Sequence, residues 1–432
     1  MRRGLGLILA IAITVTAGCG GRDALRHTFH TGPGAMAVVS IAVADRCPAP
    51  PPRRVAAWSV WVDGVRSHEA LLFPASGMDG YESLLGPFGE GRHAVELQPS
   101  DLWAPVACIA ARRLEVTVHP AGSPDHPMLS RAPVLELRAD TIGEETDLPL
   151  YAYAERLEEE HGTAWRYSVV FSNEDGGTPT RALLARWGRT TDIEQVYEVS
   201  TGGGRTAREV FQGPDHVSRV FGGRRLGDAP VLLVATLNNM VVDRGRSMAA
   251  VRPVPALVDL SRATRESTMD DRPWVYRVMR NELAAEERIV EDAPTDDRWP
   301  NVAPDPHSHV FLEARLRLDR AVAVAWVTNR SGRRLWSHYG RMPLAIDRDG
   351  WVRTAVAVGA DPLVRVAELG WACLPAPDVK AGGSCEIEAS RAFPLTREYR
   401  PGTNLVAPGR FMLKTGGEAR LTSVASGFHR SR

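Results

Sequence analysis

Two histidines separated by one residue are the side chains of this sequence best suited to metal chemistry. His307 and His309 follow Asp305, at the end of a proline-rich stretch over residues 292–306. In a strand, side chains two residues apart point to the same face, so two imidazoles could share one metal ion. A metal-dependent hydrolase centred on this pair is therefore one hypothesis. A pair of surface histidines is the alternative that we favour.

A metal at the two histidines would need further ligands from distant segments. His338, or Asp192 with Glu194 on one face of a strand, would be suitable donors. A separate acidic stretch over residues 173–175 carries the oxygen ligands that calcium prefers. The same stretch precedes Gly176 and Gly177, so a tight turn explains it better. We expect no cofactor.

The eleven tryptophans could instead form a glycan-binding surface. Most should fill cores, because large aromatic side chains dominate buried packing. Trp61 and Trp103 are the candidates that could stack on a sugar if they are exposed, together with Trp299.

The signatures of common enzymes are absent from the sequence. It contains no Gly-x-Ser-x-Gly, no His-Glu-x-x-His and no phosphate-binding lysine loop. Three consecutive glycines at 202–204 have no lysine beside them and suit a hairpin loop. These absences favour a binding or structural protein over an enzyme.

The N-terminus carries a different kind of chemistry, centred on Cys19. Residues 16–19 read Thr-Ala-Gly-Cys and follow an apolar run at 5–15 and two arginines. The run is shorter than the ~20 residues that span a membrane, so it predicts a secretory signal. An ordinary secretory signal with a chance cysteine, or an uncleaved anchor, are the alternatives.

The segment around Cys19 resembles the signal of bacterial lipoproteins, although Thr16 replaces the usual leucine. The resemblance implies that residues 1–18 are removed, that Cys19 is acylated, and that residues 19–35 form a tether. Gly20, rather than aspartate, after the cysteine favours the outer membrane by the same resemblance. We therefore expect a protein of the bacterial cell envelope, on the periplasmic or surface face, whose membrane contact is its lipid anchor.

Four further cysteines suggest disulfides, since exported proteins meet oxidising conditions. Four cysteines allow three connectivities; pairing Cys47 with Cys108 and Cys373 with Cys385 joins those nearest in sequence. Zinc is less suitable, because no Cys-x-x-Cys is present. The chain has 52 basic and 52 acidic residues, and so gives no reason to expect a nucleic-acid partner.

Short β-type runs bounded by Pro, Gly and Asp recur along the chain, including residues 36–43, 56–62 and 113–118. They predict a β-sandwich over residues 36–119. Its Val-Asp-Gly at 62–64 and Gly-Arg-His-Ala-Val at 91–95 resemble the PEGA-type sandwich modules of bacterial envelope proteins. That resemblance implies an immunoglobulin-like domain.

A larger antiparallel β-sandwich with one or two short helices should follow over residues 128–358. Within it, residues 167–172, 182–187 and 189–197 suggest a three-stranded meander, whose layout resembles Vps62-type domains. One amphipathic helix is expected between 276 and 291. Residues 359–432 form either a separate lobe or the closing strands of the same sandwich. We therefore expect a mostly β, multi-domain envelope protein that contacts glycan, peptidoglycan or another envelope protein.

Overall fold

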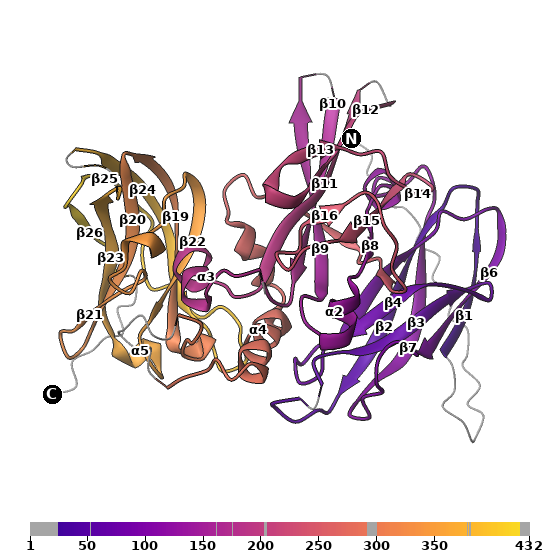
Figure 1. Cartoon of the computed structure of the whole chain (residues 1–432), viewed down its shortest axis with the longest axis horizontal. Helices are drawn as coiled ribbons and strands as arrows, with labels where there is room; N and C mark the ends of the chain where they lie inside the picture. Colours follow the sequence, from indigo (N-terminus) through magenta and orange to yellow (C-terminus); the bar gives the residue numbers. More distant parts are fainter. Residues whose placement is uncertain are drawn as a thin grey trace, which may run out of the picture.

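The computed structural model describes residues 25–51, 53–160, 162–174, 176–202, 205–291, 300–377, 379 and 382–423. Strands account for 49% and helices for 13% of the structure, which confirms the mostly β, multi-domain fold. Figure 1 shows three β-rich units in a row, with the N-terminal unit at one end and the C-terminal unit at the other. The signal segment 1–18 and Cys19 lie outside the described residues.

The N-terminal unit is a sandwich of two antiparallel sheets. One sheet has the order β1-β6-β3-β4 and consists of β1 (Leu25–Thr31), β3 (Ala56–Val62), β4 (Val65–Leu72) and β6 (Gly91–Pro99). The other has the order β5-β2-β7 and consists of β2 (Met36–Asp45), β5 (Gly80–Leu85) and β7 (Ile109–His119). The prediction of a tether over residues 19–35 is wrong for β1. The residues of this strand pair with β6, and the Phe29 side chain is buried in the core.

A tight turn joins β3 to β4 and explains the Asp-Gly pair in the sequence. Asp63 and Gly64 have φ of 49° and 81°, values that favour aspartate and glycine. The Asp63 carboxylate contacts His93 Nδ1 at 2.7 Å and accepts from the Ala94 amide at 2.8 Å. The two segments that resemble PEGA-type modules therefore lie against each other.

The central unit contains two further sheets. The six-stranded sheet has the order β13-β12-β11-β10-β9-β18 and consists of β9 (Pro149–Glu159), β10 (Gly162–Phe171), β11 (Asp192–Gly202), β12 (Arg205–Gln212), β13 (Ser218–Val220) and β18 (Pro255–Val258). The smaller sheet contains β8 (Val134–Glu136), β14 (Arg225–Leu226), β15 (Ala229–Val234), β16 (Val241–Val242) and β17 (Ala250–Val251). Two pairs, β8 with β15 and β9 with β18, are parallel, and the remaining pairs described in these two sheets are antiparallel.

Five short α-helices accompany the described strands. They are α1 (His126–Ser130), α2 (Ala139–Glu144), α3 (Thr180–Trp187), α4 (Pro273–Ala285) and α5 (Pro362–Arg365). Helix α4 agrees with the expected amphipathic helix, apart from its ends. Helix α3 corrects the strand expected at 182–187: Pro179 precedes its first turn and Gly188 ends it in the left-handed conformation.

The C-terminal unit is a third sandwich, of two four-stranded sheets. One has the order β22-β19-β24-β25 and consists of β19 (His309–Asp319), β22 (Gly350–Ala357), β24 (Ser384–Pro394) and β25 (Gly409–Lys414). The other has the order β21-β20-β23-β26 and consists of β20 (Ala321–Asn329), β21 (Arg334–Trp336), β23 (Val366–Pro375) and β26 (Glu418–Arg420). Both sheets contain strands from either side of residue 358, so the boundary expected there cuts through this sandwich.

The two disulfides of the structure are the expected ones, Cys47–Cys108 and Cys373–Cys385. The first joins the end of β2 to the segment before β7, which are neighbours in one sheet. The second joins β23 to β24 and so links the two sheets of the C-terminal sandwich. Cys373 and Cys385 are fully buried, whereas Cys47 and Cys108 are half-buried.

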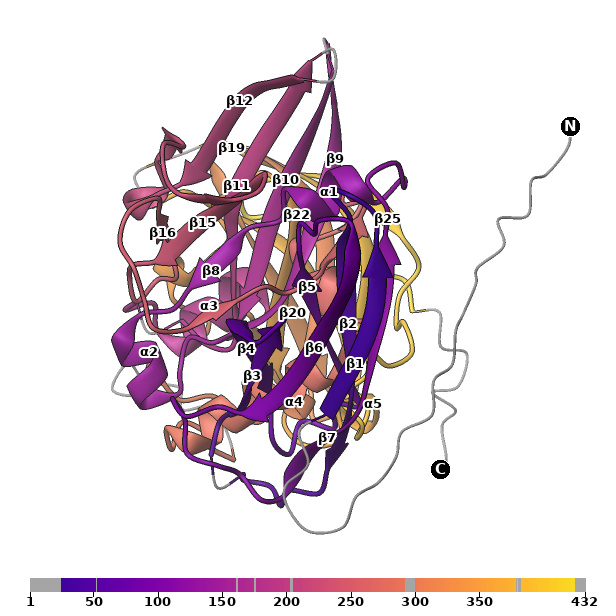
Figure 2. The same cartoon turned by 90° about the vertical axis from the view of Figure 1, so that its right-hand side faces the viewer.

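Apolar packing and a buried ionic cluster connect the three units. One hydrophobic core continues from the N-terminal sandwich into the central unit and includes Phe73 and Tyr151. At the other junction, Glu313 and Arg353 of the C-terminal sandwich meet Asp270 of the central unit. Figure 2 shows the sheets of the N-terminal sandwich in front of the C-terminal strands after a quarter turn. No described helix is long and apolar enough to cross a membrane.

Candidate functional site

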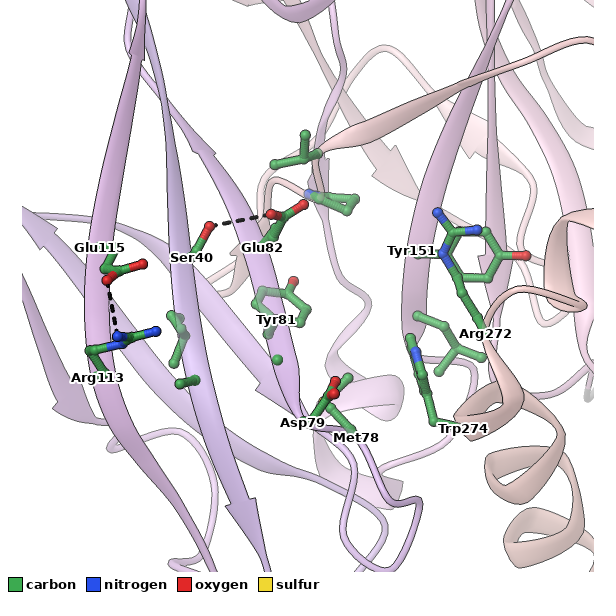
Figure 3. A pocket seen from close by; sticks show the side chains of 16 residues that line it. Ser40, Met78, Asp79, Tyr81, Glu82, Arg113, Glu115, Tyr151, Arg272 and Trp274 are labelled. Atoms are coloured by element: carbon green, nitrogen blue, oxygen red, sulfur yellow. Dashed lines mark hydrogen bonds and ion pairs between the residues drawn. The ribbon is translucent and has the colours of Figure 1, made fainter. Parts of the chain in front are cut away.

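A pocket of about 430 Å³ lies between the N-terminal sandwich and the central unit. Figure 3 shows its two walls facing each other. One wall is the outer face of the β5-β2-β7 sheet, and the other comes from β9, residues 253–254 and the residues around the start of α4. Ligand pockets often form at such junctions, because two rigid units meet there without filling all the space.

The register of the sheet arranges a polar row on the first wall. Ser40 of β2 lies opposite Glu82 of β5 and opposite Glu115 of β7. Directly opposed residues share a face of a sheet, so these three side chains line up across it. Ser40 Oγ donates to Glu82 Oε1 at 3.2 Å.

The next row of the same wall is hollow. Ala42 lies opposite Gly80 and Arg113, so the small side chains of Ala42 and Gly80 leave room above the sheet. Arg113 Nη1 lies 3.3 Å from Glu115 Oε1, in an exposed ion pair of the kind that contributes little to stability. Among the described residues, no side chain pairs with the exposed Asp79 carboxylate at the edge of the hollow.

Aromatic side chains form the opposite wall. The Trp274 ring stacks on Phe73 with centroids 5.8 Å apart and lies edge-on to Tyr151 at 6.4 Å. Burial raises the pKa of Tyr151 above its usual range, and its hydroxyl hydrogen-bonds Thr268 Oγ1 at 2.8 Å. The Tyr151 phenol is therefore neutral, and its hydroxyl is already used in the bond to Thr268. Trp274 is half-buried and offers a fixed apolar surface to the pocket.

Arg272 places one positive charge on the aromatic wall. Its Cζ lies 4.5 Å from the centroid of the Tyr151 ring, and its Nη1 donates to the Thr268 carbonyl at 3.0 Å. Stacking on the ring holds the guanidinium plane in place. No carboxylate among the described residues pairs with Arg272, so its remaining N–H groups can donate to a ligand.

The pocket has the chemistry of a binding site. Its lining residues within the described chain include carboxylates, a hydroxyl, a guanidinium and an indole, but neither histidine nor cysteine. A nucleophile activated by an imidazole is therefore not found in it. The acceptors of one wall and the donor of the other suit a ligand that both donates and accepts hydrogen bonds.

The structure does not bring the predicted metal ligands together. His307 lies in the 3₁₀ helix η3 (Pro306–Ser308) and His309 begins β19, so the expectation of two side chains on one strand face is wrong. Asp305 causes the turn: its carboxylate accepts from the His307 amide at 3.0 Å, and Pro306 favours a helical start. No group of three or more His, Cys, Asp or Glu side chains that could hold a metal occurs in the described part of the chain.

The two histidines have separate surroundings. His307 Nδ1 lies 3.2 Å from Asp305 Oδ1, and its ring packs on Tyr399 with centroids 3.7 Å apart. His309 is fully buried, and burial lowers its pKa to about 4, so it is neutral at ordinary pH. The hydrolase hypothesis gains no support from this arrangement, and the expectation that both histidines lie on the surface is wrong for His309.

The other proposed metal ligands lie in the central unit or elsewhere in the C-terminal sandwich. Asp192 and Glu194 are buried on β11 beside Glu174. Burial, together with the charge of Asp192, raises the pKa of Glu194 to about 8. Asn239 Nδ2 donates to Asp192 Oδ2 at 3.0 Å.

His338 lies after β21. Asp175 lies outside the described residues.

The tryptophans predicted to bind glycan do not line the pocket. Trp103 is buried in the core, with 6% of its surface exposed, and so cannot stack on a ligand. Trp61 is half-buried on β3, in the sheet that does not face the pocket. Trp299 lies outside the described residues. Sequence reasoning missed Trp274, because nothing in the pattern around Arg272 and Pro273 marks it as a binding residue.

A scan against models of known protein families finds no match, and a search of curated proteins finds none either. The resemblances to lipoproteins, PEGA-type modules and Vps62-type domains therefore stay predictions from the sequence.

Proposed function

We propose that this protein is a lipid-anchored envelope protein that binds a neutral glycan in the pocket between its N-terminal sandwich and central unit. The observation that carries the proposal is the pairing of an aromatic wall around Trp274 with a facing row of carboxylates. A sugar ring has apolar faces that pack on an indole and hydroxyls that donate to carboxylates. Arg272 would donate to a sugar oxygen.

The size of the pocket favours a glycan over a partner protein. Its volume of about 430 Å³ lies within the range of small-ligand sites, roughly 300–1,000 Å³. A stable protein partner covers roughly 800 Å² of each surface, which a concave site of this size does not offer. The carboxylates of Asp79 and Glu82 also disfavour a polyanionic ligand, because they outnumber the unpaired guanidinium of Arg272.

We expect Trp274→Ala to weaken the binding of short neutral oligosaccharides, such as a disaccharide of N-acetylglucosamine, by about 10-fold or more, as for aromatic hot spots. Titration calorimetry with the purified protein measures this. Asp79→Asn, an exposed change that removes one acceptor charge without touching the core, should also weaken binding.

Trp61→Ala is the matched control, since it removes the same side chain from the opposite sheet of the sandwich. Its affinity should equal that of the wild type. If Trp61→Ala lost glycan binding and Trp274→Ala bound normally, the glycan site would lie at β3 and not in the pocket. Unchanged affinity in both Trp274→Ala and Asp79→Asn would refute the pocket as the glycan site.

The anchoring part of the proposal rests on the sequence around Cys19 and on the two disulfides, which suit an oxidising compartment. We expect Cys19→Ser to abolish lipid labelling, because a hydroxyl cannot form the thioether, and to move the protein from the detergent phase to the aqueous phase. Phase partitioning after growth with a labelled fatty acid measures both. Unchanged labelling of Cys19→Ser would contradict the anchor.

A further inference from the structure

Two loops of the central unit meet in a shallow hollow that shares no lining residue with the glycan pocket. Gly222, Gly223 and Arg224 line one side of the hollow, and residues 243–246 line the other. We name residues 217–228 and 243–248 together the arginine surface. It carries five arginines and two aspartates, although the whole chain is balanced at 52 and 52.

Close backbone contacts hold the two loops together. The Asp243 carboxylate accepts from the Gly222 amide at 2.8 Å. A Cβ at Gly223 would lie only 2.2 Å from the Asp243 carbonyl oxygen, so only glycine permits this approach. The arrangement of charges on the arginine surface is therefore fixed before any ligand arrives.

Only some of these arginines are used within the protein. Arg224 pairs with Glu136 at 2.6 Å, and Arg225 pairs with Glu209. Arg244 and Arg246 are exposed and make no ion pair with any described residue. Two guanidinium groups on a preformed surface without an acidic partner indicate an anionic ligand.

Exposed apolar side chains accompany the arginines. Val220 is 79% exposed and Met248 is 75% exposed, and each lies two residues from a residue that lines the hollow. Consecutive Cα atoms are about 3.8 Å apart, so both lie within roughly 8 Å of it. Leu226 on β14 is a further exposed apolar residue, 42% exposed. In Figure 1, β13 and β14 both lie in the upper part of the central unit.

We propose that the arginine surface docks on an anionic phospholipid bilayer. Arg244 and Arg246 contact lipid phosphates, and Val220 and Met248 enter the interface between headgroups and acyl chains. Basic side chains with neighbouring apolar ones are the combination that binds bilayer surfaces, whereas a soluble anion gives no role to exposed valine and methionine. This contact is separate from the acyl anchor and from the glycan pocket, and it would fix how the folded units face the membrane.

Vesicle co-sedimentation of residues 19–432 tests the proposal, with Cys19→Ser in every arm so that neither the apolar run at 5–15 nor acylation contributes. Binding to vesicles of phosphatidylglycerol and phosphatidylcholine should exceed binding to phosphatidylcholine alone and should fall with salt. Arg244→Gln with Arg246→Gln should lower the partition coefficient on the anionic vesicles by about 30-fold, since each arginine near such a surface contributes about fivefold.

Arg112→Gln with Arg262→Gln is the matched control. Both residues are exposed, neither forms an ion pair with a described residue, and the change in net charge is the same. The control pair should bind as the parent chain does. Equal losses in the two double variants would show a response to net charge alone and would overturn the site.

Two further experiments distinguish docking on an anionic bilayer from binding of a small soluble anion. Val220→Ser with Met248→Ser should weaken vesicle binding at high salt, where only the apolar contact remains; unchanged binding would overturn the membrane proposal. Sodium phosphate should release the protein no better than sodium chloride at equal ionic strength. Preferential release by phosphate would instead identify a small-anion site.

Discussion

Replacing Arg353 by methionine is expected to lower the free energy of unfolding by about 3–5 kcal/mol, the usual cost of removing one partner from a buried ionic cluster. Arg353 is fully buried on β22 and donates to Glu313 Oε1 at 2.7 Å and to Asp270 Oδ2 at 2.9 Å. Its third contact is the Tyr276 hydroxyl at 2.6 Å, which in turn donates to Asp270 Oδ1 at 2.6 Å. Methionine would leave both carboxylates short of a donor, and the Glu313 side chain is only 6% exposed, so water cannot readily replace the guanidinium there.

The position of Arg353 explains why the loss should be large. Glu313, Arg353 and Arg391 come from β19, β22 and β24, whereas Asp270 and Tyr276 belong to the central unit. Two carboxylates therefore face two guanidinium groups, and the cluster is balanced only when the C-terminal sandwich is docked. Loss of Arg353 destabilises the docking as well as the sandwich.

Chemical denaturation followed by tryptophan fluorescence measures the change. Arg156→Met is the control, because Arg156 and Glu158 form an ion pair at 3.3 Å with both side chains more than half exposed. The control should change the unfolding free energy by less than about 1 kcal/mol. A similarly small change in Arg353→Met would show that the cluster does not hold the two units together.

Acid provides a second measurement of the same cluster. Burial alone would raise the pKa of Glu313, but the charges and hydrogen bonds of Arg353 and Arg391 lower it to about 2, from an ordinary value of 4.5. Folding therefore favours the ionised form: its contribution is complete above pH 4.5 and is lost as the pH falls toward 2. In Glu313→Gln, the decrease in the free energy of unfolding between pH 4.5 and about pH 2 should be smaller than in the wild type.

Local patterns explain why the β fold and the disulfides could be predicted. Strand β3 is an apolar run interrupted only by Ser59 and bounded by turn signals, and its ends at Ala56 and Val62 are those expected from the pattern. Cys47 and Cys108 flank strands that belong to the same short sandwich, so proximity in sequence was a reliable guide. These features depend on neighbours within a few residues or within one compact unit.

The misassigned elements depend on contacts that are remote in sequence. Residues 182–187 form an apolar run too short to distinguish strand from helix, and the decision comes from packing against β22. Thr354 Oγ1 donates to the Ala185 carbonyl at 2.6 Å, across more than one hundred residues of chain. Strand β1 was missed for the same reason, since only pairing with β6 defines it.

The candidate pocket could not be predicted from the sequence, because no segment of it carries a recognisable pattern. Ser40 and Glu115 are ordinary residues on the polar face of a sheet, and Arg272 and Trp274 are ordinary residues at a helix start. Only the docking of the two units places them across a hollow. The histidine pair drew attention by its spacing, but Pro306 bends the chain and turns the two side chains apart.

Removal of the first disulfide, by Cys47→Ala with Cys108→Ala, should cost about 4 kcal/mol of stability. The bond closes a loop over a sequence separation of 61, and loop-closure entropy gives this value for the unfolded chain. Cys373→Ala with Cys385→Ala is the comparison: its separation of 12 gives about 3 kcal/mol from the same relation. Denaturation midpoints of the two double variants measure the difference.

We expect Cys47–Cys108 to be reduced before Cys373–Cys385, although it contributes more to stability, because it is more accessible to a reductant. Cys47 and Cys108 are half-buried beside the β5-β2-β7 sheet, whereas Cys373 and Cys385 are fully buried between the two sheets of the C-terminal sandwich. Mild reductant on the native protein, followed by thiol alkylation and peptide mapping, should therefore label Cys47 and Cys108 first. Because that bond fastens β2 to β7, its reduction should loosen the wall that carries Ser40 and Glu115 and weaken glycan binding. Reduction of Cys373–Cys385 first, or unchanged glycan affinity after Cys47–Cys108 is open, would mean that the disulfide does not brace the pocket wall.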